Sequence, residues 1–590
     1  MTGNCERPRR GPSGRGAVVG ATVLGALLVH AGLTAWSATL HTPSNDEVAH
    51  LPAGISHWQF GRFDLYCVNP PLVRLIATLP VVLSRPATNW GRMDTAYRSE
   101  WSVGTEFIAA NGERAWWYFT LARWACIPLS LLGAYVCYRW AGELYGRPAG
   151  LLALVLWCFG PNVLAHAQMI TPDIGATSFG VAAGYCFWRW LKQPTWGRAV
   201  AAGLVLGLAE LSKMTWIILF PLWPLLWAVW RLREAAPSRA GGWLRGGLQL
   251  VVILQLGLWL INLGYLFEGS FQKLGDYRFS SAALRGPASE ELDVRGNRFA
   301  GTWLGEVPVP LPKDYILGLD VQKVDFEKKM PSYLGGEWRF DGGWWYYYLY
   351  ALAVKVPLGT LLLVLLAAGC RLAARPPSAS LSDEIVLLAP AAAILVLVSS
   401  QTGFNHHLRY VLPAFPFVLV WAGQVMSPAL RAGRAVRAAA AVLVAWSVVS
   451  SLSVYPHSLS YFNELGGGPT GGHAHLLNSN IDWGQDLFFL KRWQQEHPEA
   501  GDLRLAYGER VDPSAVGVRF TRATAEPAPG WYAVSVNRLR GEEGTYSYFL
   551  RFRPVAMAGY SIYIYHLTPA EAGSARRELG LPPLSEAPSR

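Results

Sequence analysis

The sequence predicts an α-helical polytopic membrane protein with a small soluble α/β domain at its C-terminal end. Apolar residues make up 52% of the 590 residues and charged residues only 15%, a composition too apolar for one soluble domain. A membrane helix needs about 20 mainly apolar residues, and about eleven segments meet that measure. The two shortest, 198–212 and 215–231, could instead merge into one hairpin or re-entrant pair, which would change the count. The segments lie near residues 17–38, 115–138, 148–166, 172–191, 198–212, 215–231, 246–267, 345–370, 383–400, 409–427 and 435–454.

The distribution of Lys and Arg over the connections predicts the orientation. Basic residues gather in a tail, 1–16, and in every second connection, near 139–147, 189–198, 231–245, 371–375 and 431–437. The opposite short connections hold only Lys213 and Arg409. By the positive-inside rule the tail is cytoplasmic and the long loops are external. The net charge of +11 then reflects membrane topology rather than nucleic acid binding.

Three regions follow along the chain: the tail 1–16, a transmembrane domain 17–454 and an external domain 455–590. The first apolar run is about 22 residues long, which suits a retained span better than a cleaved signal peptide. Of the seven cysteines, only Cys67 falls in an external loop, so no disulfide framework or thiolate metal site is indicated.

Two long external loops interrupt the transmembrane domain, at 39–114 and 268–344. In the first, Asp46–Phe60 and Pro71–Leu83 have helical apolar spacing but are too short to cross, so we expect two helices in the interface plane. The second ends in an aromatic run, 344–348, which is typical of a belt at the lipid headgroups.

The soluble domain is expected to mix helix and strand. An amphipathic helix is predicted over Gln485–His497, and strands over Leu503–Tyr507, Trp531–Val536 and Tyr560–His566.

Two adjacent carboxylates, Asp46 and Glu47, directly follow the first span. Carboxylates in lipid are costly, so we expect them in a polar cavity at the interface. The alternative is that both only cap the helix that begins there, because acidic residues favour a first helical turn.

The order of several motifs resembles a known family. A first span, the Asp46-Glu47 pair, an interfacial helix, Pro70-Pro71-Leu72 and later Pro172-Asp173 are similar to the GT-C membrane glycosyltransferases. The likeness is greatest to family 39, the protein O-mannosyltransferase and lipid A aminoarabinose transferase group, and covers roughly the first 430 residues. The resemblance implies a polyprenyl-phosphate sugar donor, transfer on the outer face and inversion at the anomeric carbon. It also makes Asp46 the key aspartate.

The chemistry of such a donor agrees with this resemblance. The phosphate leaves already ionised, so the site needs cations for the leaving group and a base for the acceptor hydroxyl. A carboxylate acting as base contributes about 10²–10⁴-fold. Asp46 is the predicted base, and Glu47 assists it or orients the helix.

Candidates for the donor phosphate are Arg74, Lys213, Arg409 and Tyr410. Asn69 stands where the family often has a basic residue, so we expect Arg74, one helical turn further, to supply that charge. Arg74 could equally be a snorkelling anchor, and Lys213 a lone interfacial anchor. The family resemblance gives Arg409-Tyr410, followed by Leu412-Pro413, the role of holding the lipid phosphate.

Asp173, Asn69 and His406 are candidates for orienting the acceptor or the Asp46 helix. His406 and His407 are neighbours and point to different sides of a helix, so they do not predict a metal site. A divalent cation held by Asp46, Glu47 and the donor phosphate is chemically sensible, but no residue pattern requires it. The cluster 478–486, with Trp483, is either a sugar-binding platform or a helix start rich in Asp and Asn.

Two other functions compete with a glycosyltransferase. A transporter or flippase for lipid-linked sugars would carry charges near mid-membrane, whereas the candidates here lie at external helix ends. An inactive scaffold that binds lipid-linked sugar is the third possibility, suggested by Asn69. The acceptor, whether protein, lipid or glycan, is not indicated. High Arg, Ala and Gly usage points to a bacterial inner membrane.

Overall fold

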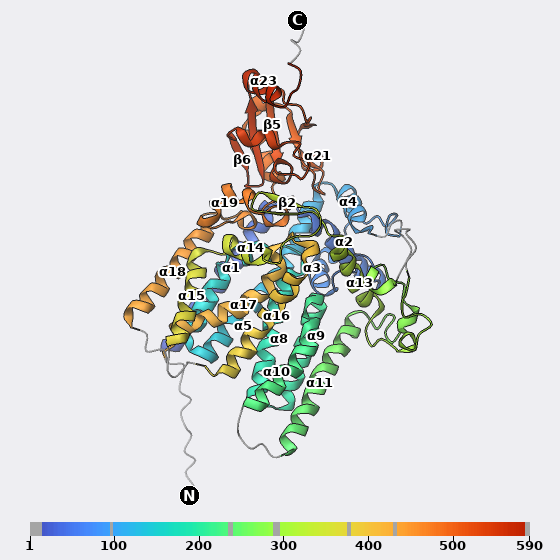
Figure 1. The fold of residues 1–590 in the computed structure, drawn as a ribbon, viewed down its shortest axis with the longest axis vertical. Helices are drawn as coiled ribbons and strands as arrows, with labels where there is room; N and C mark the ends of the chain where they lie inside the picture. Colours follow the sequence, from blue (N-terminus) through green and yellow to red (C-terminus); the bar gives the residue numbers. More distant parts are fainter. Residues whose placement is uncertain are drawn as a thin grey trace.

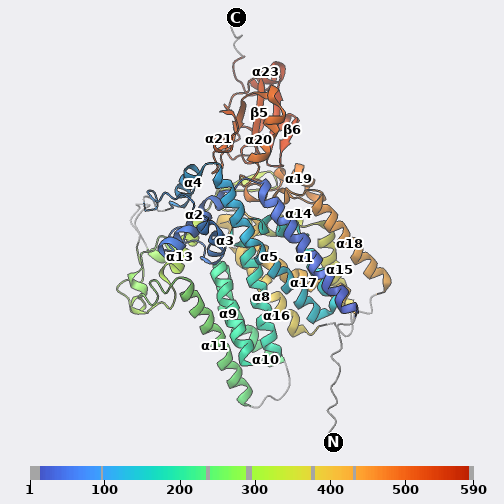
Figure 2. The ribbon, with the colours of Figure 1, turned by 180° about the vertical axis from the view of Figure 1, so that it is seen from behind.

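The computed structural model describes residues 14–94, 98–233, 240–286, 296–373, 379–428 and 433–583. A bundle of long helices forms the body, and the C-terminal domain stands on one end of it (Figures 1 and 2). Within these residues seven helices are long and apolar enough to cross a membrane, or nine if each of two bent pairs is one span. The predicted polytopic helical fold with a small α/β domain is confirmed. The predicted tail lies mostly outside the described residues.

Every predicted apolar segment is helical in the structure. The bundle consists of α1 (Gly14–Leu40), α5 (Arg114–Tyr145), α6 (Arg147–Cys158), α7 (Pro161–Ala167), α8 (Pro172–Lys192), α9 (Trp196–Ser212), α10 (Leu219–Arg233), α11 (Ala240–Gly264), α14 (Tyr347–Lys355), α15 (Leu358–Ala373), α16 (Leu381–Ser400), α17 (Phe415–Ala422) and α18 (Arg434–Leu452). The pairs α6–α7 and α14–α15 bend by 60° and 112°. The doubtful pair near 198–231 is resolved into α9 and α10, separated by the 3₁₀ turn Met214–Ile218.

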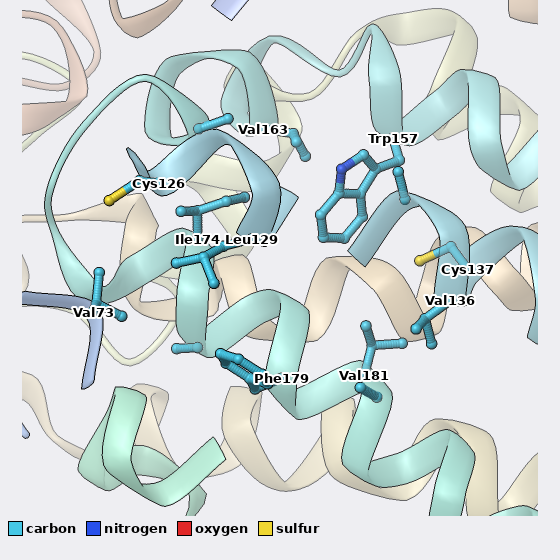
Figure 3. Close-up of a cluster of buried hydrophobic side chains, with 14 of the residues drawn as sticks. Val73, Cys126, Leu129, Val136, Cys137, Trp157, Val163, Ile174, Phe179 and Val181 are labelled. Carbon is cyan, nitrogen blue, oxygen red and sulfur yellow. The ribbon is translucent and has the colours of Figure 1, made fainter. Parts of the chain in front are cut away.

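Part of the apolar core of the bundle, where α5, α6 and α8 meet, is shown in Figure 3. Trp157 is fully buried there and donates from its indole nitrogen to the Ser130 hydroxyl at 3.2 Å. The same hydroxyl lies 2.8 Å from Nε2 of His30 on α1. Because buried polar groups need partners, this chain of contacts holds α1 against α5 and α6.

The loop 39–114, predicted to be external, contains three helices among its described residues. The structure confirms the two predicted ones, as α2 (Asn45–Phe60) and α3 (Leu72–Leu83), and adds α4 (Glu100–Asn111). Residues 47–57 of α2 are buried, since α3 and α4 cover that helix. α2 therefore carries little free surface of its own, and its position is fixed by packing.

The described residues of the loop 268–344 contain regular structure that the composition did not predict. They include α12 (Ala282–Arg285), α13 (Lys313–Glu327) and an antiparallel hairpin of β1 (Ser332–Leu334) and β2 (Glu337–Arg339). The prediction of an aromatic belt is wrong for most of the run 344–348. Trp344, Tyr347 and Tyr348 are buried in a core with the soluble domain, and within the run only Trp345 and Tyr346 are exposed.

The soluble domain is a five-stranded mixed sheet with short helices, which agrees with the predicted α/β class. Its strand order is β4-β3-β5-β7-β6, with β3 parallel to β4 and β5, and β7 antiparallel to β5 and β6. The strands are β3 (Leu503–Ala506), β4 (Phe520–Arg522), β5 (Gly530–Ser535), β6 (Ala556–Ala558) and β7 (Ile562–Leu567), and the helices α19 (Gly468–Gly471), α20 (Leu487–Glu496), α21 (Pro513–Val516), α22 (Val536–Leu539) and α23 (Pro569–Glu578). The strands β4 and β6 were not predicted because each has only three residues.

Glycines allow the closest helix contacts in the bundle. A Cβ on Gly180 of α8 would lie 1.7 Å from a ring carbon of Trp216, whereas one on Gly197 of α9 would meet nothing within 4 Å. Overpacking of this kind typically costs about 1–3 kcal/mol. We expect Gly180→Ala to lower the melting temperature of the purified protein by several degrees and Gly197→Ala to leave it unchanged, as measured by thermal unfolding in detergent. Equal melting temperatures for the two variants would contradict the packing of α8 on Trp216.

Candidate active site

Four charged side chains from four separate elements meet where the bundle faces the soluble domain. Arg409, in the 3₁₀ turn Leu408–Ala414, donates to Asp46 at 2.9 Å and to Asp173 at 3.4 Å. Lys213, at the end of α9, donates to Asp173 at 2.7 Å. Asp46 and Asp173 both lie in the first turn of their helices, where the helix dipole favours a negative charge. The sequence-predicted Asp46, Asp173, Lys213 and Arg409 thus form one network of two carboxylates and two cations.

Aromatic rings flank this network. The Tyr410 ring lies 5.1 Å from the Lys213 ammonium and 5.6 Å from the Arg409 guanidinium. The guanidinium also lies 4.2 Å from the Trp483 ring of the C-terminal region. Such cation–π contacts are worth about 0.5–2 kcal/mol, so they restrain Arg409 in addition to its two ion pairs.

Asp46 and Glu47 are adjacent in sequence but lie in different environments. The Asp46 side chain is 18% exposed, whereas that of Glu47 is fully buried. Glu47 accepts two hydrogen bonds from Arg123 of α5, at 2.8 and 2.7 Å, and further ones from the backbone N–H groups of Ser44 and Ile170. Burial raises the pKa of Glu47, but Arg123 and these donors together hold that pKa below its ordinary value. Glu47 is therefore an ionised, fully paired group, an arrangement that suits the orienting role rather than direct chemistry.

Arg123 extends the same cluster toward α1. Its guanidinium also donates to the backbone carbonyls of Ala38, His41 and Thr42 at 2.7–3.0 Å. These carbonyls include the last turn of α1 and the link to α2, so the ion pair joins α1, α2 and α5. No sequence motif pointed to Arg123, although a single arginine inside an apolar span is a signal that could have found it.

A cavity of about 190 Å³ opens beside Asp46. Arg409 and Trp483 line it together with side chains of the soluble domain, namely Glu509, Arg510 and Asn537. A larger cavity of about 430 Å³ shares His406, Asn478, Glu509 and Asn537 with it. Together the two cavities make a groove between the bundle and the soluble domain, and Asp46 lies at its inner end.

The remaining candidates have structural partners. Arg74 is buried and donates to the backbone carbonyls of Leu65, Tyr66 and Asn69. Its guanidinium therefore holds the loop 65–69. This contact differs from both roles expected from the sequence, which were binding of the donor phosphate and anchoring at the lipid headgroups. Asn69 takes part through its carbonyl group. His406 lines the groove, and its Nε2 contacts the Pro331 carbonyl.

A divalent cation shared by Asp46 and Glu47 does not fit this geometry. Both oxygens of Glu47 are taken by Arg123 and backbone donors, while Asp46 pairs with Arg409. Asp46 and Glu47 are therefore not arranged to share a metal ion.

The fold and the site define a polytopic helical membrane protein with a charged site at one end of the bundle. Residues 118–259 match the family model described as dolichyl-phosphate-mannose-protein mannosyltransferase. Over that stretch the predicted resemblance to GT-C glycosyltransferases of family 39 is confirmed. No curated protein gives a significant match.

Solved structures also show similarity over the chain. Structures of ArnT from Cupriavidus metallidurans, in the apo state and bound to undecaprenyl phosphate, are 14% identical, with TM-scores of 0.46 and 0.44, and each alignment covers 94% of this chain and 98% of the other. The Saccharomyces cerevisiae protein O-mannosyltransferase Pmt1–Pmt2 complex bound to the sugar donor is 16% identical, with a TM-score of 0.32, covering 42% of this chain and 33% of the other.

The different environments of Asp46 and Glu47 predict that variants of the two residues differ in thermal stability. Removing one partner of a buried ion pair costs about 3–5 kcal/mol because the other charge stays buried. We expect Glu47→Gln to lower the melting temperature strongly and Asp46→Asn, at a partly exposed position, to change it much less. Thermal unfolding of both variants, purified in the same detergent, measures this. A larger loss for Asp46→Asn than for Glu47→Gln would contradict the assignment of Glu47 as the structural member of the pair.

Proposed function

We propose that the protein is an inverting membrane glycosyltransferase that moves a sugar from a polyprenyl-phosphate donor to an acceptor on the outer face of a bacterial inner membrane. The observation that supports this most is the position of Asp46, a partly exposed carboxylate at a cavity that also contains a buried arginine. The family-model match over 118–259 supports the class of reaction.

In the proposed reaction Asp46 accepts the proton of the acceptor hydroxyl. The hydroxyl oxygen then bonds to the anomeric carbon as the bond between that carbon and the phosphate oxygen breaks. The phosphate leaves with its electron pair and needs no proton. A single displacement of this kind inverts the anomeric configuration, and no covalent enzyme intermediate forms.

Arg409 and Lys213 are the proposed phosphate ligands. Both are held in place before any donor binds, Arg409 by two carboxylates and Trp483, and Lys213 by Asp173. Cations positioned in advance stabilise developing charge without reorganisation at the moment of reaction. The Tyr410 ring contacts both cations, and Asp173, which pairs with both, is the proposed positioning residue.

The decisive experiment is sugar transfer by the purified protein in nanodiscs, with a panel of polyprenyl-phosphate sugars and membrane extract as acceptor, followed by mass spectrometry. We expect Asp46→Asn to lose at least about 10²-fold in rate, because the base is removed. The matched control is Asp341→Asn, which removes an 86% exposed carboxylate paired with Lys329 and should retain full activity.

Two outcomes would contradict the proposal. Full transfer by folded Asp46→Asn would remove Asp46 as the base. In a parallel reconstitution of the protein into closed vesicles, movement of lipid-linked sugar across the membrane without any transfer would favour the transporter function instead.

The acceptor is proposed to enter along the groove beneath the soluble domain. Arg510 and Glu509 line its inner cavity, and the Arg510 guanidinium lies 5.2 Å from the Trp101 ring of α4. The soluble domain and the loop 39–114 therefore both contribute to the wall of this cavity, which suits selection of the acceptor.

This assignment predicts a separation of kinetic parameters. We expect Arg510→Ala to raise the acceptor KM severalfold while the KM for the donor stays unchanged, because the donor phosphate is assigned to Arg409 and Lys213. Arg519→Ala, an exposed arginine that does not line the groove, is the control. A change in donor KM alone would place Arg510 on the donor side.

A further inference from the structure

A second cluster of chemically reactive side chains lies outside the groove, where the bundle joins the soluble domain. His41 follows α1, His457 follows α18, and Asp486 directly precedes α20. Nδ1 of His457 lies 3.5 Å from Oδ1 of Asp486, and Nε2 of His41 lies 3.9 Å from the same oxygen. One ligand atom from each residue lies within 4.8 Å of the other two. Three segments far apart in the sequence thus bring three potential metal ligands together.

The hydrogen bonds around the cluster leave these ligand atoms unused. Nδ1 of His41 donates to the Ser37 carbonyl at 3.0 Å, so the lone pair of the neutral ring is on Nε2, which faces Asp486. Oδ2 of Asp486 accepts from the Ser561 hydroxyl at 2.7 Å and from the Gln485 amide at 3.1 Å. Among the described residues, neither Oδ1 of Asp486 nor Nδ1 of His457 has a hydrogen-bond partner.

Burial makes unused polar atoms at this place costly. The side chains of Asp486, His41 and His457 are 0%, 5% and 16% exposed. A buried polar atom without a partner typically costs about 1–3 kcal/mol. Gly559 leaves room for the carboxylate, since its φ is +59° and a Cβ there would lie 2.2 Å from Oδ2 of Asp486. The local backbone therefore accommodates the Asp486 carboxylate although one of its oxygens has no hydrogen bond.

We propose that His41, His457 and Asp486 bind a divalent transition-metal ion of the zinc class, which joins the soluble domain to the transmembrane bundle. Two imidazoles and one carboxylate are a ligand set that suits Zn²⁺. Bonds of about 2.0–2.1 Å in a tetrahedral site place ligand atoms roughly 3.3 Å apart, close to the 3.5 and 3.9 Å observed. The hydrogen bond that His41 donates to the Ser37 carbonyl and the one that Asp486 accepts from the Ser561 hydroxyl are outer contacts of the kind that orient metal ligands.

One member of the cluster, His457, faces a neighbouring cavity. A cavity of about 400 Å³, lined by His457, Phe489 and Tyr560 among others, adjoins the cluster. Its lining shares no residue with the cavity beside Asp46, so the metal is separate from the sugar-transfer site. Its expected role is structural, because it would cross-link the end of α1, the segment after α18 and the start of α20.

Metal binding by the full-length protein in nanodiscs tests this inference without any activity assay. The protein is stripped with chelator, dialysed against Zn²⁺ and assayed for metal by mass spectrometry, and Co²⁺ is titrated to record its visible d–d absorption. We expect about one Zn²⁺ per chain, a tetrahedral Co²⁺ spectrum, and a rise in melting temperature with Zn²⁺ because ligand binding stabilises the folded state.

Variants separate this site from adventitious binding. His457→Gln and Asp486→Asn should lose the Co²⁺ spectrum, whereas His497→Gln, at an exposed histidine beside Glu499, should keep it. Ser561→Ala leaves all three ligands in place and should weaken Zn²⁺ binding about 10–100-fold, which keeps the test informative if a ligand variant fails to fold. Metal content near zero in the wild type, or identical binding by wild type and the folded Asp486→Asn variant, would overturn the proposal and leave the cluster as a histidine–carboxylate ion pair.

Discussion

The buried ion pair between Glu47 and Arg123 is the interaction on which the arrangement of the site depends. The two residues are 0% and 3% exposed, and every hydrogen bond that Arg123 donates goes to Glu47 or to carbonyls at the end of α1. A buried charge without its partner is far more costly than a buried pair, so α1, α2 and α5, which share these bonds, are fixed together. The start of α2 is held in one position as a result.

The position of Asp46 follows from that constraint. With Glu47 turned into the protein toward α5, its neighbour in the first turn of α2 faces Arg409 and the cavity. The two carboxylates of one motif therefore lie in different environments: Glu47 is buried against Arg123, and Asp46, the proposed base, lies at the cavity. The balance of charge at the site is even, with Asp46 and Asp173 facing Lys213 and Arg409. An incoming phosphate would compete with these carboxylates for the two cations, and the carboxylate it displaces would be free to act as base.

The soluble domain is an integral part of the site rather than an appendage. The Thr42 backbone N–H donates to Gln485 and the Asn45 backbone N–H to Trp483, at 3.0 and 2.9 Å. Lys355 of α14 is buried and donates to the carbonyls of Leu459 and Asn480, which fixes the segment that leads into the domain. Trp483 reaches Arg409, and Glu509 lines the cavity, only because these contacts hold the domain against α1 and α2. The proposed metal cluster lies at the same junction and would strengthen it.

The sequence by itself determined the class of fold and most of its elements, because long apolar runs and their periodicity are local properties that burial in lipid or protein enforces. It also singled out Asp46, Asp173, Lys213 and Arg409 as candidates, through the resemblance of their motifs to a known family and, for Lys213, because its connection holds little other charge. Tertiary structure alone decided which of them meet. Arg74 donates to carbonyls of the loop just before its own helix, through a fold of the chain that apolar spacing does not reveal. Trp344, Tyr347 and Tyr348 are covered by the soluble domain, which is distant in sequence. The division of roles between Asp46 and Glu47 depends on Arg123, 76 residues further along the chain, and the meeting of His41, His457 and Asp486 depends on the docking of a whole domain. Neither contact leaves a periodic signal, since both arise from packing between elements rather than from the local preferences of the chain.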